Sequence, residues 1–478
     1  MNNKMILYIL SIILKLEAAF LLLPALTGLI YREREWAAYF GAAVLCLAAG
    51  FLMSRKKPED TTFFTKEGFV IVALSWIIMS VFGALPFVFS RDIPNYTDAL
   101  FEMISGFTTT GASVLDNIDL VSHAGRMWRS FSHWIGGMGV IVFMLAILPS
   151  SGANMRLMRA ESPGPSVGKL VPKVKQTAGI LYQIYIVLTL IEIVLLLVSG
   201  MPVFDAVTIS FGTAGTGGFS ARASGFEEYT ILQQGIVTVF MILFGVNFNA
   251  YYLLLAKKWK DAFQIEEIRW YLGIIAAAVV MIAINTRHLY PTAFLSFHHA
   301  AFQVGSIITT TGFATADFNL WPELSKTILV TLMFIGACAG STGGGLKVAR
   351  MIILVKSVRL DLFRAIHPRG VKTLKMDGKS LDEETVRGVS AYFVTYIVLF
   401  ILSNLILSFN GLDPVTNFTA VTANFNNIGP GLSLVGPMGN FGMMPWYAKY
   451  TLMFDMLAGR LELYPMMMLF IPAIWRKR

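Results

Sequence analysis

Long apolar runs dominate the hydrophobic pattern of the chain. About 20 apolar residues let an α-helix cross roughly 30 Å of hydrocarbon, and about ten segments come near that length with almost no charge. The predicted spanning helices are 5–30, 36–53, 68–89, 128–148, 178–198, 231–256, 271–286, 326–355, 389–409 and 447–475. A β-barrel would instead show short segments of alternating polarity. The pattern therefore predicts an all-α polytopic membrane protein.

Four shorter apolar segments lie between these long ones, at 97–108, 203–214, 296–309 and 414–426. A helix of about 12 residues is only about 18 Å long, so it cannot cross the hydrocarbon layer. It must enter the membrane and return, and a non-helical return is tolerated only where protein or water covers it. We therefore expect each short helix and its polar exit to face a water-filled cavity.

The exits from the short segments resemble one another. They read "TTTGAS" (108–113), "GTAGTGGFS" (212–220), "TTTGFA" (309–314) and "NFNNIGPG" (424–431). Their glycines, taken as Gly111, Gly217, Gly312 and Gly429, are 106, 95 and 117 residues apart, with Gly218 as an alternative in the second exit. Such self-similarity indicates a repeat architecture. It predicts an N-terminal helix pair (1–57) and four pore repeats, each a helix, a re-entrant helix and a helix (58–168, 169–262, 263–378 and 379–478).

Four such units can surround one central pore. Each re-entrant helix would direct its partly negative C-terminal end inward, which favours a cation. Each exit glycine can turn its carbonyl toward the axis, and rings of carbonyls replace the hydration shell in potassium filters. A single Thr-rich turn is more often a helix cap or a packing site, but four at matched positions favour a filter. The candidate filter residues are Thr109, Thr110, Gly111, Thr216, Gly217, Gly218, Thr310, Thr311, Gly312, Asn427, Ile428 and Gly429.

Composition and charge agree with a membrane protein. The chain is 55% hydrophobic and 14% charged, with a net charge of +9. Its Lys and Arg residues cluster at 55–57, 169–175, 257–260, 356–388 and 476–478. These clusters predict that both termini are cytoplasmic. They also account for the positive net charge without a nucleic-acid partner. The first apolar segment is too long for a signal peptide, and the two cysteines indicate neither a disulfide framework nor a metal site.

One predicted span contains a glycine-rich interruption, "GACAGSTGGGLK" (336–347). Glycine costs a helix near 1 kcal/mol relative to alanine, and broken backbone at membrane depth must line a cavity. Close helix packing through small residues is the alternative. We favour a flexible gate below the filter, formed by Gly340, Ser341, Thr342, Gly343, Gly344 and Gly345.

Arg460 lies within the last predicted span and is the second gate candidate. An arginine at mid-membrane costs roughly 2.5–3.5 kcal/mol and is functional by default. Counted from the exit glycines, it aligns in depth with the glycine-rich loop. The alternative is a buried ion pair with Asp455 or Glu462. Lys15, Glu17 and Glu192 also lie in apolar helices, and no transport role is assigned to them.

The motifs together resemble those of the Trk/Ktr/HKT superfamily of potassium transporters. They are the exits above, "WIGGMGVIV" (134–142), "GVNFN" (245–249) and "GSTGGGLK" (340–347), and the extra N-terminal helix pair is similar to that of the bacterial TrkH branch. The resemblance implies a homodimer in the bacterial inner membrane, one pore per subunit, and a cytosolic TrkA-type nucleotide-binding partner.

The expected function is potassium uptake through a gated, channel-like pore, with membrane lipid as surroundings, K⁺ in the filter and no covalently bound cofactor. A symporter coupled to H⁺ or Na⁺ is the alternative. We do not expect an enzyme, because no set of His, Asp, Glu or Cys residues converges at membrane depth in the sequence pattern.

Overall fold

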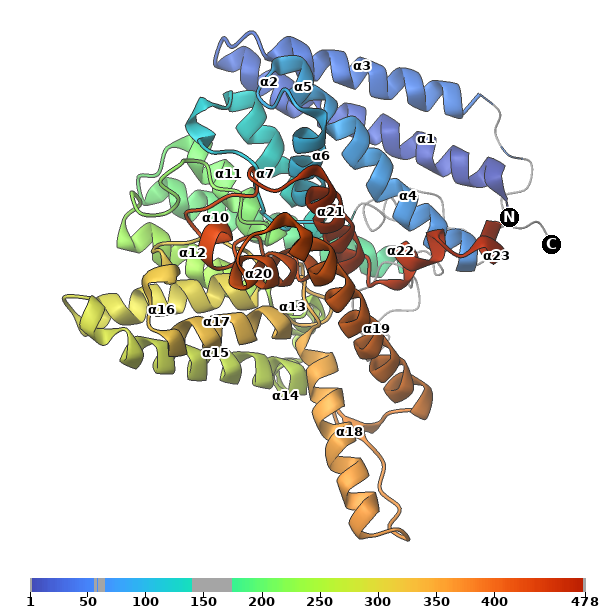
Figure 1. The fold of residues 1–478 in the computed structure, drawn as a ribbon, viewed down its shortest axis with the longest axis vertical. Coiled ribbons are helices and arrows are strands. Elements are labelled where there is room, and N and C mark those ends of the chain that lie inside the picture. The colour runs from blue at the N-terminus through green and yellow to red at the C-terminus, as the bar shows by residue number, and fades with distance from the viewer. Residues whose placement is uncertain (1, 56–57, 59–64, 140–173, 476–478) are drawn as a thin grey trace.

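The computed structural model describes residues 2–55, 58, 65–139 and 174–475. The second half of the predicted span 128–148, and the charges at 56–57, 169–173 and 476–478, lie outside these residues. Most of the described chain is helical (Figure 1). Its only strands there, β1 (Lys375–Met376) and β2 (Lys379–Ser380), form an antiparallel hairpin.

The helices follow the predicted order. The N-terminal group is α1 (Asn3–Phe20), α2 (Leu22–Ile30) and α3 (Trp36–Met53). There follow α4 (Thr65–Gly83), α5 (Leu85–Ser90), α6 (Tyr96–Phe107) and α7 (His123–Gly137), then α10 (Val174–Val198), α11 (Val203–Gly215), α12 (Ile231–Phe244), α13 (Phe248–Leu255) and α14 (Trp259–Gln264). The chain continues through α15 (Glu266–Asn285), α16 (Ala293–Ile308), α17 (Glu323–Ile335) and α18 (Val348–Ile366), and then α19 (Glu383–Leu407), α20 (Pro414–Phe425), α21 (Trp446–Arg460), α22 (Tyr464–Leu469) and α23 (Pro472–Trp475). Short 3₁₀ turns lie at Ile118–Leu120, Arg287–Leu289, Phe318–Leu320, Ser408–Asn410 and Ser433–Val435.

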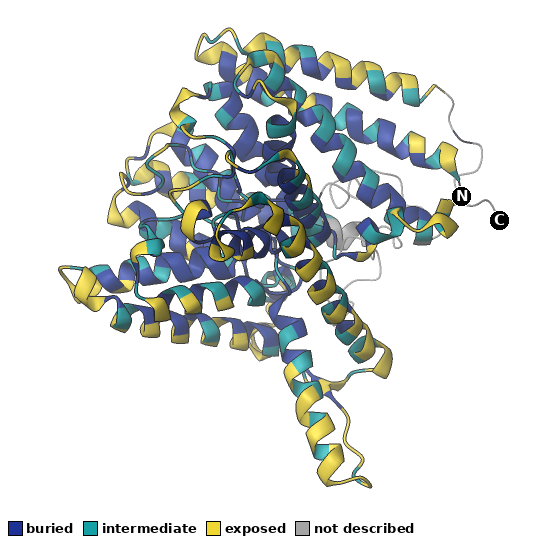
Figure 2. Cartoon of the chain, in the orientation of Figure 1, coloured by how far each residue is buried: buried dark blue, intermediate teal, exposed yellow. Residues whose placement is uncertain are grey.

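The four short helices predicted from the sequence are α6, α11, α16 and α20. Three of them begin at a side-chain cap: Asn95, Thr292 and Asp413 each accept a hydrogen bond from a backbone N–H in the first turn. Such caps satisfy N–H groups that the helix itself leaves unpaired. All four helices are almost wholly buried along their C-terminal halves (Figure 2).

Two of the predicted continuous spans are wrong. The segment 231–256 bends by 90° between α12 and α13, and the last span breaks after Arg460. The segment 326–355 is non-helical from residue 336 to 347, as the glycine-rich interruption predicted. Within the described residues, six helices are each long and apolar enough to cross a membrane, or seven if the bent pair counts as one. The ten spans thus stay a prediction, because broken helices contribute to several of them.

Apolar cores join helices that are far apart in the sequence. The largest core packs α1, α3, α4, α6 and α7 against α20 and α21. Another joins α11 and α12 to Phe302 of α16. The helices α18 and α19 extend away from the main body, and their far ends are largely exposed (Figures 1 and 2). The packing therefore places helices from the two ends of the chain side by side, with the short helices inside.

Candidate functional site

The four exits adopt one backbone conformation. In each, two residues with positive φ are separated by one other residue: Thr109 and Gly111, Thr216 and Gly218, Thr310 and Gly312, and Asn427 and Gly429. The first member has φ between 55° and 62° and the glycine has φ between 78° and 96°. Such angles are uncommon for residues with a side chain. Their repetition shows that the four exits are structural equivalents.

The exits also form a closed ring. A Cβ atom added to Gly111 would lie 2.1 Å from the carbonyl oxygen of Gly217, in the second exit. The same contact then recurs from each exit to the next: Gly218 to Thr311 O at 1.9 Å, Gly312 to Ile428 O at 2.0 Å, and Gly429 to Thr110 O at 2.7 Å. Each glycine therefore abuts the carbonyl just before the glycine of the following exit, and the fourth exit returns to the first.

The ring corrects the register of the second exit. Gly218 has the positive φ and the neighbour contact that Gly111, Gly312 and Gly429 have, whereas Gly217 has neither. The preferred assignment to Gly217 was therefore wrong, and the alternative, Gly218, is the equivalent glycine. The corrected spacings are 218 − 111 = 107 and 312 − 218 = 94 residues.

Each short helix ends three or four residues before its ring glycine. The last residues of α6, α11, α16 and α20 are Phe107, Gly215, Ile308 and Phe425. The C-terminal end of a helix carries roughly −0.5 of an elementary charge. Four such ends around a ring of backbone oxygens make a site that favours a cation without using a carboxylate.

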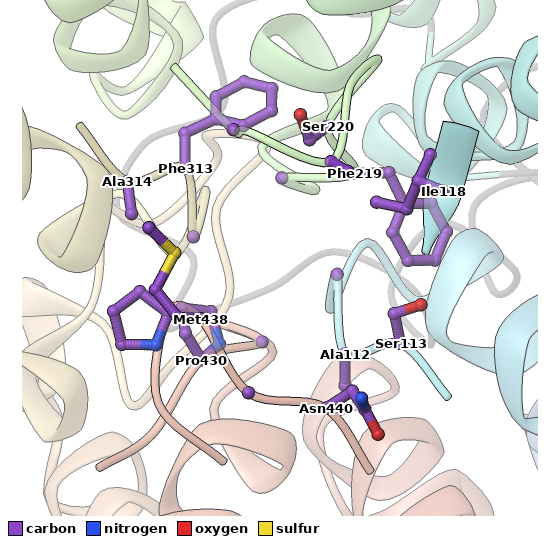
Figure 3. Close-up of a pocket in the computed structure, with 18 of the residues that line it drawn as sticks. Ala112, Ser113, Ile118, Phe219, Ser220, Phe313, Ala314, Pro430, Met438 and Asn440 are labelled. Atoms are coloured by element: carbon purple, nitrogen blue, oxygen red, sulfur yellow. The ribbon is translucent and has the colours of Figure 1, made fainter. Parts of the chain in front are cut away.

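A cavity that is open to solvent leads to the ring (Figure 3). All four ring glycines line it. The guanidinium of Arg222 also lines it and pairs with Asp205 at 2.7 Å and Glu228 at 2.8 Å. The hydrogen bond from Arg222 lowers the pKa of Glu228, so that carboxylate stays charged. This positive group is therefore neutralised by its partners.

On the other side of the ring lies the glycine-rich loop. The backbone N–H of Gly344 donates to Thr310 Oγ1 at 2.6 Å, and Thr216 Oγ1 donates to the carbonyl of Thr342 at 3.0 Å. A Cβ atom on Gly344 would lie 2.6 Å from Asn426 O. The loop thus contacts three exits at the residues that precede the ring glycines.

Arg460 connects this loop to α7. Its guanidinium donates to Thr342 O at 2.8 Å, Gly136 O at 2.7 Å and Gly137 O at 3.0 Å. The predicted proximity to the loop is observed. The two acids of the alternative reading are engaged with other groups, because Glu462 pairs with Arg350 and Asp455 accepts from Ser403.

Comparison with known proteins identifies the architecture. The family model described as TrkH, cation transport protein, matches residues 36–284 and 270–477. This chain belongs to the TrkH family. It is 38% identical to the Trk system potassium uptake protein TrkH of Salmonella typhimurium and 37% identical to that of Escherichia coli K12, over the full length of both chains. The crystal structure of the potassium transporter TrkH from Vibrio parahaemolyticus matches with a TM-score of 0.88 and 33% identity, over all of both chains.

Membership of the TrkH family establishes a membrane-embedded transport protein, not an enzyme.

Several residues at the site of this family member were not predicted from the sequence. Glu267, in the first turn of α15, accepts from the N–H groups of Ala339 and Ala349 at 2.6 and 3.1 Å and so holds both ends of the glycine-rich loop. Its only signal was an acid at the start of an apolar helix. Lys347 donates to the carbonyl of Gly343 within the same loop.

A buried ion pair braces the first exit of this TrkH family member. Arg129 Nε lies 2.7 Å from Glu102 Oε1, and both side chains are at most 1% exposed. Glu102 also accepts from Ser113 Oγ and the N–H of Val114, just after the first ring glycine. Lys15 is one of the charged residues to which the sequence assigned no transport role. It donates to Ser54 Oγ at 2.8 Å, remote from the ring.

Proposed function

We propose that the protein takes up potassium through a gated, channel-like pore whose filter is the ring of Gly111, Gly218, Gly312 and Gly429. The closed ring of backbone oxygens at four helix C-termini carries this proposal. Carbonyl oxygens can replace the hydration shell of K⁺, and the partly negative helix ends stabilise its charge. The names of the relatives, potassium uptake proteins, support the same ion.

The glycine-rich loop and Arg460 form the gate in this proposal. The loop contacts the inner side of three exits, and Arg460 ties it to α7 through three carbonyls. Movement of the loop away from Thr216 and Thr310 would open the path below the filter. The driving force is the membrane potential, worth about 2.3 kcal/mol per charge per 100 mV.

The same proposal includes the membrane, the orientation and the partners of the pore. The clusters of Lys and Arg, among them residues 356–388, support cytoplasmic termini, and the family supports the bacterial inner membrane, a homodimer and a cytosolic TrkA-type nucleotide-binding subunit.

Flux into liposomes tests the function. Purified protein should take up ⁸⁶Rb⁺, and added K⁺ should compete with it far better than added Na⁺. Gly111→Ser should weaken that preference, because a Cβ there meets the carbonyl of Gly217. Gly411→Ser is the matched control, since Gly411 has a similar φ of 74° and open space around it.

The same liposomes separate the pore from the alternative, a cation-coupled symporter. The pore predicts ⁸⁶Rb⁺ uptake without Na⁺ and with the proton gradient collapsed by an ionophore. A strict requirement for either ion, with a fixed flux ratio, would contradict the channel-like mechanism and favour the symporter.

A further inference from the structure

Each exit forms one wall of the ring. The second wall lacks a side chain that the other three walls have. The residue just before the ring glycine is Thr110, Thr311 or Ile428 in those walls, but Gly217 in the second. Each of these residues supplies the carbonyl that the preceding exit abuts. The second wall therefore needs something else to fill the space and to hold that carbonyl in position.

His133 of α7 fills this space. A Cβ atom on Gly217 would lie 2.2 Å from His133 Cγ and 2.4 Å from Nδ1, so the imidazole stands where the side chain would begin. His133 is fully buried. The fit continues along the helix, because a Cβ on Gly215 would lie 2.2 Å from the backbone oxygen of His133, and α7 packs closely against both α6 and α11.

The imidazole also joins two walls through both of its nitrogens. His133 Nδ1 lies 2.7 Å from the carbonyl oxygen of Gly106, near the end of the first short helix. The N–H of Phe219, directly after Gly218, donates to Nε2 at 3.2 Å. One neutral tautomer, with the proton on Nδ1, satisfies both bonds. The ring of Phe219 packs on the imidazole at 4.2 Å between centroids.

We propose that His133 is a positioning residue that sets the second wall of the filter, and with it the discrimination between K⁺ and Na⁺. This inference rests on the proposed function. The imidazole replaces the missing side chain at Gly217 and holds the backbone on the far side of Gly218 through Phe219. A histidine that merely satisfied its hydrogen bonds in the core would affect folding but not ion preference.

Two substitutions that keep different halves of the imidazole test this role. In His133→Gln, the amide oxygen reaches the Nε2 position and still accepts from Phe219. In His133→Asn, the shorter amide still donates to Gly106 but cannot reach Phe219. The measurement is the K⁺ to Na⁺ preference in ⁸⁶Rb⁺ competition, together with thermal unfolding. We expect Gln to stay within about twofold of the unsubstituted protein and Asn to lose roughly fivefold or more, the equivalent of one hydrogen bond.

A double variant adds a gain-of-function arm. His133→Ala should lower the ion preference, and His133→Ala with Gly217→Thr should recover part of it, because threonine then occupies the vacated space as it does at Thr110 and Thr311. His298→Ala is the matched control, since it removes another buried imidazole, one that bonds Gln234 rather than the ring.

The outcomes distinguish the inference from the function on which it rests. If the unsubstituted protein shows no K⁺ preference, the proposed filter fails and this role falls with it. If that protein is selective and His133→Asn is equally selective, the role of His133 alone is overturned. Equal loss in the Gln and Asn variants, with lowered unfolding temperatures in both, would likewise overturn it in favour of a purely structural histidine.

Discussion

Removing the Arg460 side chain is the sharpest test of the gate. In the structure, its guanidinium donates one hydrogen bond to Thr342 of the loop and two to carbonyls of α7. Arg460→Ala removes the connection between them. If the loop leaves its position below the ring when the pore opens, this substitution destabilises the closed state selectively.

The size of the effect follows from the contact that is lost. A hydrogen bond from a charged donor contributes about 1.5–3 kcal/mol, and each 1.4 kcal/mol changes an equilibrium about tenfold. Losing the bond to Thr342 should therefore raise the open-to-closed ratio by about tenfold to 150-fold. The charge itself acts separately, because at about 8 Å and an effective dielectric near 20 it would repel K⁺ by roughly 2 kcal/mol.

Two further substitutions separate the connection from the charge. Arg460→Lys keeps the charge but cannot reach all three carbonyls, whereas Arg460→Gln removes the charge and keeps one donor. If the hydrogen bonds hold the gate, both should raise ⁸⁶Rb⁺ flux per reconstituted protein. If repulsion alone limits flux, only the glutamine variant should do so.

The K⁺ to Na⁺ preference should stay nearly unchanged in all three variants, because the ring lies on the other side of the loop. Size-exclusion profiles and unfolding temperatures establish that each variant is folded. A folded Arg460→Ala protein with flux equal to or below that of the unsubstituted protein would refute this account of the gate.

Other substitutions address the ring, the loop and its supports. Gly218→Ser should lower the K⁺ to Na⁺ preference in ⁸⁶Rb⁺ competition as strongly as Gly111→Ser; full selectivity in the Gly218 variant would argue against the corrected register. Deleting 340–345 should raise ⁸⁶Rb⁺ flux several-fold, and a folded deletion variant with unchanged flux would exclude the loop as an obstruction. Glu102→Gln leaves Arg129 buried without its carboxylate, so it should cost about 3–5 kcal/mol of stability, measured as a fall in unfolding temperature; unchanged stability would show that the pair is not needed.

The sequence predicted the short helices well because their signals are local. Apolar length and an exit glycine defined α6, α11 and α20 to within one residue at each end, whereas α16 begins three residues before the predicted start. The equivalence of the four exits followed from the same pattern. The long spans were predicted less well, because a run of apolar residues does not reveal a break such as the 90° bend after α12.

The register of the second exit depends on a contact between distant residues. Both Gly217 and Gly218 fit the sequence pattern. They are distinguished by the positive φ of Gly218 and its contact with Thr311 O, and by the imidazole of His133, 84 positions before Gly217, which occupies the side-chain position of Gly217. The acceptors of Arg460 at Thr342, Gly136 and Gly137 are backbone carbonyls, which every residue possesses. Its neighbourhood could therefore be predicted from spacing, but the groups that it contacts could not.

The glycine-rich loop breaks the symmetry of the ring, since it joins α17 to α18 and so comes from one unit alone. In the proposed mechanism, this one loop then controls conduction, rather than four equivalent segments, one from each exit. The switch would be a one-step, all-or-none event in each pore, without the graded intermediates expected when several subunits move in turn. Helix α18 starts where the loop ends and extends out of the main body (Figure 1). A displacement of its far end would therefore move the glycines beneath the ring.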